Sequence, residues 1–218
     1  MKEYLFKELI DLKTNPLLFV LENNLVEKGT WLEFGVFRGH TINKISSYTA
    51  DKVYGFDSFE GLPGMWEVDE HTKINQGHYS YKSYAEENNL NPIYPTVNDN
   101  VVLISGLFSE TLPDFISDQK VTFIHIDCDL YSSTKDIFDN ITPNIADGCV
   151  IVFDELVNYP NYKRHELLAF EEWIKENNIE YEFIGMNGKY VDNPQKVFPA
   201  STQKVAVRIS NNPGCIHG

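Results

Sequence analysis

Residues 121–133 read V-T-F-I-H-I-D-C-D-L-Y-S-S, and the rest of the predicted fold is organised around them. The first six residues of this stretch are apolar and mostly β-branched apart from Thr122 and His125, which is typical of a strand covered on both faces in a parallel sheet. The chain then runs directly into Asp127, Cys128 and Asp129. Because open α/β sheets place ligand chemistry at the carboxyl ends of buried strands, these residues are candidates for a binding site.

A second apolar run, C-V-I-V-F at residues 149–153, ends in the same way at Asp154 and Glu155. If the two strands are neighbours in one parallel sheet, their axes lie about 4.8 Å apart and Asp127, Asp154 and Glu155 converge. Carboxylates brought together repel each other unless protons or a cation neutralise them. The pattern therefore predicts a divalent cation with oxygen ligands, which would be Mg²⁺, Mn²⁺ or Ca²⁺.

Length and composition indicate one globular domain spanning residues 1–218, with 42% hydrophobic residues to build its core. No apolar run is long enough for a bilayer, and the N-terminus has no apolar segment of the signal-peptide type, so we expect no membrane partner. The three cysteines lack metal-type or C-x-x-C spacing, and we expect free thiols in the cytoplasm. A net charge of −14 argues against nucleic acid as a partner.

Strand and helix signals alternate along the chain, which predicts an α/β fold with a mostly parallel sheet. Residues 1–29 are expected to form helices that cover the sheet, with Leu5, Leu9 and Leu12 at helical spacing. Residues 62–98 lack clear periodicity and are expected to form a lid over the substrate. The expected strands are residues 30–34, 52–56, 101–105, 121–126, 149–153, 181–184 and 204–209, and the main expected helices are residues 41–48, 107–115, 133–140 and 165–177.

The first expected strand leads into a glycine turn, L-E-F-G-V-F-R-G at residues 32–39. Gly35 permits a tight bend with close backbone approach, and Gly39 permits close helix packing. Asp57 ends the next strand about twenty residues later, which is the spacing of an acid that binds ribose hydroxyls. The turn lacks G-x-G-x-x-G, so a cofactor with ribose but without pyrophosphate fits better. A helix cap at Asp57 and a purely structural strand-end acid at Glu33 are the alternatives.

Taken together and in order, several blocks resemble the macrocin O-methyltransferase family. The blocks are L-E-F-G-V-F-R-G, V-Y-G-F-D-S-F-E-G-L-P, G-L-F-S-E-T-L-P, H-I-D-C-D-L-Y-S-S-T-K-D and I-V-F-D-E-L, within residues 31–156. The resemblance implies a doubly wound, Rossmann-like sheet of seven strands with the last strand antiparallel. It also implies methyl transfer from S-adenosylmethionine, with a divalent metal such as Mg²⁺, to a hydroxyl of a sugar or another natural-product diol.

The resemblance also assigns residues to the site. Glu33 and Gly35 would line the methionine end of the cofactor. The remaining cofactor-binding positions would be Gly39, Asp57, Ser58, Phe59, Ser105, Gly106, Leu107 and Asp127, and the metal ligands would be Asp127, Asp154 and Glu155. The chain departs from the family at Asp154-Glu155, where Asp-Asp is common.

The lid does not match the family well enough to identify the catalytic base. His78 and His165 are the candidates, with Lys135 a weaker one, and a surface or capping role is the alternative for each. His125 lies within a strand and is expected to be a core or near-site histidine.

Other functions remain open from the sequence. The D-x-D of Asp127 and Asp129 is also found in phosphatases that use an aspartate nucleophile with Mg²⁺. A non-catalytic nucleoside-binding module is a further alternative, and a catechol-type phenol could replace the sugar as acceptor. The expected partner is a hydroxylated small molecule, and the sequence leaves homo-oligomerisation undecided.

Overall fold

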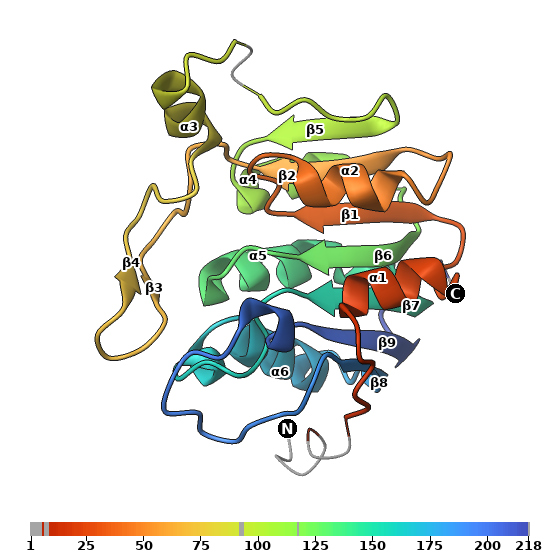
Figure 1. Ribbon diagram of the computed structural model, residues 1–218. Helices are drawn as coiled ribbons and strands as arrows, with labels where there is room; N and C mark the ends of the chain where they lie inside the picture. The colour runs from red at the N-terminus through yellow and green to blue at the C-terminus, as the bar shows by residue number, and fades with distance from the viewer. Residues whose placement is uncertain (1–5, 7–8, 92–93, 117, 218) are drawn as a thin grey trace.

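The computed structural model describes residues 6, 9–91, 94–116 and 118–217 (Figure 1). Its main sheet has seven strands in the order β5-β2-β1-β6-β7-β9-β8. The strands are β1 (Thr30–Phe34), β2 (Val53–Asp57), β5 (Val101–Ser105), β6 (Val121–Ile126), β7 (Ile145–Phe153), β8 (Glu180–Met186) and β9 (Val205–Asn211). Strand β9 pairs antiparallel with both β7 and β8, whereas the pairs among β5, β2, β1, β6 and β7 are parallel. This arrangement confirms the predicted fold class.

Helices cover both faces of the sheet, as Figure 1 shows. Helices α1 (Pro16–Glu22) and α2 (His40–Ser46) lie on one face, and α4 (Phe108–Phe115), α5 (Tyr131–Ile141) and α6 (Glu166–Glu176) lie on the other. Each face therefore has its own apolar core. Ile42 of α2 and Val53 of β2 belong to the first. In the second, the rings of Phe138 of α5 and Trp173 of α6 stack with their centroids 4.2 Å apart. All six residues of β6 are buried, as expected for a central parallel strand.

The strand order places a crevice beside β1 and β6. These two strands are neighbours, but β1 continues toward β2 on one side and β6 continues toward β7 on the other. A reversal of this kind leaves a crevice at the carboxyl ends of the strands, where α/β proteins bind ligands. The glycine turn after β1 and the acids after β6 and β7 all lie at this edge.

The predicted lid, residues 62–98, contains a small hairpin and one helix that project beyond this edge of the sheet (Figure 1). The hairpin pairs β3 (Trp66–Glu67) with β4 (Lys73–Ile74), and the helix is α3 (Tyr81–Glu87). Asn161 connects the hairpin to the segment after β7, because its backbone N–H donates to Val68 O at 3.1 Å and its side chain donates to Glu67 O at 2.9 Å. The segment after β7 also contains the short 3-10 helix η3 (Tyr162–Arg164).

The N-terminal segment differs from its prediction. Helix α1 covers the sheet as expected, with Asn15 accepting a capping hydrogen bond from Leu17 N–H. The predicted helical spacing through Leu9 and Leu12 is wrong for residues 9–15, which are not helical, while Leu5 lies outside the described residues. Here Asp11 forms a parallel bridge with Met186, so the segment extends the sheet beside β8. Pairing with a strand distant in sequence outweighs the local leucine spacing.

The other short elements are 3-10 helices, η2 (Thr142–Asn144) and η4 (Ala200–Thr202). In the part of the chain that the structure describes, no helix combines the length and hydropathy needed to cross a membrane.

Candidate active site

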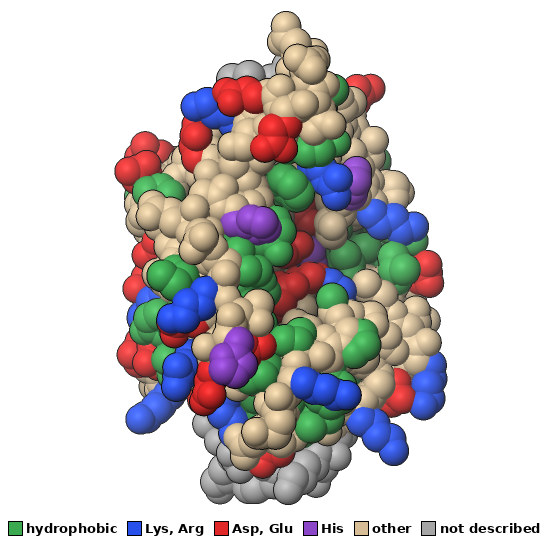
Figure 2. All heavy atoms as spheres, turned by 60° about the vertical axis from the view of Figure 1, so that its left-hand side comes forward, with side chains coloured by type: hydrophobic (Ala, Val, Ile, Leu, Met, Phe, Trp, Pro, Cys, Tyr) green, Lys and Arg blue, Asp and Glu red, His purple; other side chains and the backbone are tan. Residues whose placement is uncertain are grey.

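A cavity of about 830 Å³ opens at the carboxyl edge of the sheet, between the glycine turn and the lid. Its volume lies in the range of small-molecule sites. Figure 2 shows acidic side chains at the bottom of a central hollow. The acids that line the cavity are Asp57, Asp127, Asp129, Asp136 and Glu155.

One end of the cavity is built by the glycine turn after β1. The Asp57 carboxylate accepts hydrogen bonds from Val36 N–H and Phe37 N–H, both at 2.8 Å, and from Phe59 N–H at 2.7 Å. Asp57 therefore fixes the shape of the turn while still lining the cavity. A carboxylate offers about four acceptor sites, so it can also accept a hydrogen bond from a ligand hydroxyl.

Gly35 brings this turn against the first acid. Its φ of +91° is one that glycine adopts readily, and a Cβ at this position would lie 1.8 Å from the backbone oxygen of Asp127. Two backbone hydrogen bonds of 2.9 Å flank the contact, from Gly35 N–H to Phe56 O and from Asp127 N–H to Phe34 O. The absence of a side chain at residue 35 thus allows the tips of β1 and β6 to meet.

The other predicted cofactor-binding residues divide into two groups. Ser58, Gly106 and Leu107 line the cavity together with Gly35, Asp57 and Asp127. Four predicted residues do not line it, namely Glu33, Gly39, Phe59 and Ser105. Gly39 is the N-cap of α2, and Phe59 is buried among lid aromatics such as Tyr94.

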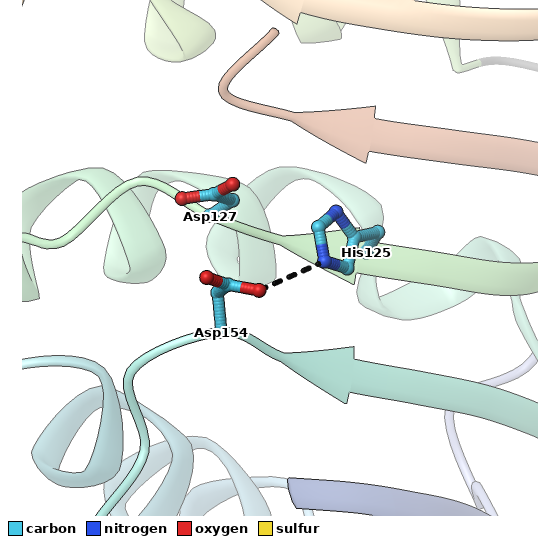
Figure 3. Close-up of side chains that lie close together, drawn as sticks. All are labelled: His125, Asp127 and Asp154. Carbon is cyan, nitrogen blue, oxygen red and sulfur yellow. Dashed lines mark ion pairs between the residues drawn. The ribbon is translucent and has the colours of Figure 1, made fainter. Parts of the chain in front are cut away.

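The acids at the cavity floor form two overlapping groups that share Asp127. In one group, ligand atoms of Asp127, Asp129 and Glu155 lie within 4.8 Å of one another, and in the second those of His125, Asp127 and Asp154 do. Figure 3 shows Asp127 at the tip of β6 facing Asp154 at the tip of β7. Of the predicted metal residues, Asp127 thus meets Asp154 in one group and Glu155 in the other, which also contains Asp129. Asp154 does not line the cavity. Asp129 is buried with a φ of +63°, a backbone conformation that the D-x-D spacing alone did not reveal.

The electrostatics of this floor suit a divalent cation. Burial, and then the charge of Asp154, raises the pKa of Asp127. Burial also raises the pKa values of Asp129 and Glu155, with further contributions from neighbouring acids. One oxygen of Glu155, Oε2, is buried and has no hydrogen-bond partner among the described residues. Clustered carboxylates of this kind gain stability from a hard cation with oxygen ligands, so the residues fit Mg²⁺ or a similar ion.

Asp154 has two cationic neighbours. Its Oδ1 pairs with Nζ of Lys204 and lies 3.5 Å from Nε2 of His125, the contact drawn in Figure 3. Burial alone would raise the pKa of Asp154, but His125 and Lys204 hold it well below its ordinary value. The charges of the surrounding acids likewise keep Lys204 in its ammonium form, although burial opposes this by lowering its pKa.

His125 links two strands behind the cavity. Its Nδ1 lies 2.9 Å from Oε1 of Glu33 on β1, and both side chains are fully buried. Burial lowers the pKa of His125, yet its contacts with Asp154 and Glu33 raise it to about 10. Glu33 is thus a partner of His125 in this structure, and His125 is a near-site residue, as the sequence suggested.

Neither candidate base lines the cavity. His78 is exposed with its ring against Tyr79, and His165 precedes α6 with its Nε2 3.1 Å from the backbone oxygen of Glu67. Lys135 pairs with Asp139 on the surface of α5. Glu166, which the sequence analysis missed, lies fully buried behind the acids, where its Oε1 accepts long hydrogen bonds from the backbone N–H groups of residues 128 and 129.

The lid end of the cavity is mainly apolar. Aliphatic and aromatic side chains dominate this end, with a few polar groups from the lid and from the segment before β9. The lining residues here include Leu62, Pro63, Trp66, Val68, Thr72, Ile74, Tyr79, Val197, Ala200 and Gln203. The cavity therefore combines a backbone-rich end at the glycine turn, an acidic floor and an apolar end beneath the lid.

The sheet has a glycine turn and an acidic floor at the point where its strand order reverses. This combination is typical of the class of α/β folds that bind nucleosides. The Macrocin-O-methyltransferase (TylF) family model matches residues 18–191, and the chain belongs to this family. This result confirms the family resemblance found in the sequence.

Two curated relatives come from Streptomyces. The chain is 28% identical over 137 residues to 8-demethyl-8-(2,3-dimethoxy-alpha-L-rhamnosyl)-tetracenomycin-C 4'-O-methyltransferase of Streptomyces olivaceus, covering 61% of this chain and 52% of the relative. It is 28% identical over 180 residues to demethyldecarbamoylnovobiocin O-methyltransferase of Streptomyces niveus, covering 76% and 64%. The chain thus spans between about half and two thirds of the length of these relatives.

Solved structures support the fold. A calicheamicin methyltransferase matches with a TM-score of 0.57 at 22% identity, covering 87% of this chain and 74% of that one. The O-methyltransferase NovP matches with a TM-score of 0.53 at 21% identity, covering 89% and 76%. At these identities the likeness concerns the fold.

Proposed function

We propose that this chain is an S-adenosylmethionine-dependent O-methyltransferase that acts on a hydroxyl of a small molecule, a sugar or another natural-product diol, with the help of a divalent cation. Family membership supports the reaction class, and the names of both curated relatives describe O-methyltransferases of natural products. The observation that carries the proposal is the acidic floor formed by Asp127, Asp129 and Glu155 directly beside the glycine turn.

The glycine-turn end is the proposed donor site. Asp57 is held by three backbone N–H groups and lines the cavity, so its remaining acceptor capacity can meet ribose hydroxyls. Gly106 and Leu107 follow β5 at the same edge and can flank the base of the nucleoside. The close approach of Gly35 to Asp127 keeps the donor end next to the acids.

The predicted metal ligands Asp127, Asp154 and Glu155, together with Asp129, would hold the cation. When bound, S-adenosylmethionine supplies an electrophilic methyl group and the cation supplies Lewis-acid stabilisation of the attacking oxygen. In the transfer, an O–C bond forms as the C–S bond breaks, and the hydroxyl proton passes to a base. Asp129 and Glu155 line the cavity, so they would hold the cation next to the acceptor hydroxyl.

The lid supplies the acceptor end and limits the access of water. Its apolar lining, including Trp66 and Ile74, suits the carbon face of a sugar ring or an apolar aglycone. Holding methyl and oxygen in line can contribute about 7–11 kcal/mol, more than a positioned base is worth. We therefore expect orientation and the cation to dominate the rate.

The experiment that tests this function has two stages. Stabilisation by S-adenosylhomocysteine in a thermal-shift assay, increased by MgCl₂, would support both the donor site and the cation site. Methyl transfer from isotope-labelled S-adenosylmethionine to a panel of glycosides, polyols and catechols would then identify the acceptor class. Hydrolysis of an aryl phosphate without methyl transfer would favour the aspartate-nucleophile phosphatase. Binding of S-adenosylhomocysteine without transfer to any acceptor would favour a non-catalytic nucleoside-binding module.

A further inference from the structure

Lys204 lies beside the acidic floor because of the register of the last strand. Strand β9 runs antiparallel to β7, and Phe153 is paired with Val205. Asp154 directly follows β7, and Lys204 directly precedes β9. The two residues therefore lie opposite each other at the same end of this strand pair. The fold itself thus places an ammonium group against a predicted metal ligand.

The contact is largely shielded from solvent. The side chain of Lys204 is 15% exposed and that of Asp154 is 14% exposed, and Nζ of Lys204 contacts Oδ1 of Asp154. The same oxygen faces Nε2 of His125 from the other side. A pair with so little exposure is screened weakly by salt, so its effect on nearby charges is larger than that of a surface ion pair.

The ammonium group also lies close to the other acids. A carboxylate oxygen of Asp127 is within 4.8 Å of one of Asp154, and Asp127 is shared with the group formed by Asp129 and Glu155. A cation bound among these oxygens would therefore be repelled by the Lys204 charge, and it would compete with Lys204 for Asp154.

We propose that Lys204 is a built-in counterion of Asp154 that competes with the divalent cation and weakens its binding. This inference rests on the proposed function, because it concerns the cation site of the methyltransferase. Lys204 neutralises part of the acidic floor when no divalent cation is bound, and it withdraws from Asp154 when one binds. Lys204 is thus a positioning residue, since it acts on the site through Asp154.

Magnesium binding measured by isothermal titration calorimetry tests the inference. Lys204→Met removes the charge, and Lys204→Gln removes the charge but keeps an N–H donor for Asp154, so it serves if the first variant folds poorly. Both variants should bind MgCl₂ at least about tenfold more tightly than the original chain. Lys204→Arg should behave like the original chain because it keeps the charge, and so should Lys120→Met, which changes an exposed lysine.

A second readout separates competition from simple damage to the fold. The melting temperature of Lys204→Gln without metal should be lower than that of the original chain, because Asp154 loses a counterion, and MgCl₂ should raise it by more. Equal or weaker magnesium binding by Lys204→Gln would overturn the inference, as would the absence of binding to both proteins. Binding of S-adenosylhomocysteine, measured on the same samples, separates this failure from failure of the methyltransferase proposal.

Discussion

Gly35→Ala should damage the site far more than an ordinary glycine substitution does. Two costs combine at this position. The φ of +91° is unfavourable for alanine by about 1–2 kcal/mol, and the new Cβ would lie 1.8 Å from the backbone oxygen of Asp127. Non-bonded carbon and oxygen atoms approach to roughly 3.3 Å, so the tips of β1 and β6 must move apart by about 1.5 Å.

The expected loss follows from this displacement. Overpacking typically costs a further 1–3 kcal/mol, so we expect Gly35→Ala to lower the free energy of unfolding by about 2–5 kcal/mol. Because a misplacement of about 1 Å can cost about 10²-fold in rate, methyl transfer should fall by at least that factor. Chemical denaturation measures the first quantity, and transfer of labelled methyl measures the second.

Gly77→Ala is the matched control for backbone strain. Gly77 has a similar φ of +80°, but a Cβ there would meet no heavy atom within 4 Å. It should therefore lose only about 1–2 kcal/mol of stability. If Gly35→Ala is within about 0.5 kcal/mol of Gly77→Ala and transfers methyl at the original rate, the contact between the glycine turn and Asp127 has no functional importance.

Three further substitutions test other parts of the site. Asp127→Asn should raise the melting temperature without metal, because it relieves the repulsion between Asp127 and the neighbouring acids. It should lower methyl transfer by about 10³-fold or more. Unchanged transfer by this variant in the presence of a chelator would exclude a metal-binding role for Asp127. His125→Ala should cost about 3–5 kcal/mol in denaturation, because the buried Glu33 carboxylate loses its partner and Asp154 keeps only Lys204. Exposed His71→Ala should be nearly neutral, and equal losses would contradict the buried network. Asn161→Ala removes a hydrogen bond to the lid hairpin. It should raise KM for the acceptor without changing the affinity for S-adenosylhomocysteine. A change in both quantities would show that the lid contributes to donor binding as well as to acceptor binding.

Much of the sheet could be predicted from the sequence because its strands are buried on both faces. Continuous apolar runs such as residues 121–126 and 149–153 end at acids, and parallel strands bring those acids to one edge. The same logic predicts that Asp127, Asp154 and Glu155 lie at one edge of the sheet, where Asp127 is close to both of the others. The antiparallel last strand followed from the family resemblance, since local periodicity does not determine which neighbours a strand chooses.

The features that escaped prediction depend on contacts between distant segments. Lys204 reaches Asp154 only through the register of β9 against β7, and Glu33 is paired with His125 on the neighbouring strand. Asp129 joins the acids because its backbone adopts a positive φ. His165 was predicted as a candidate base, but its ring contacts the backbone of the lid hairpin. In each case, the sequence shows the residue type but not its partner.

The attachment of the lid hairpin has a consequence for engineering. Because Asn161 and His165 bind the backbone of Glu67 and Val68, the hairpin and the segment after β7 form one unit. A chimaera that receives only the hairpin of another family member would lose these contacts. Acceptor preference should therefore be transplanted by exchanging residues 62–80 and 156–166 together, which keeps the graft and its support matched.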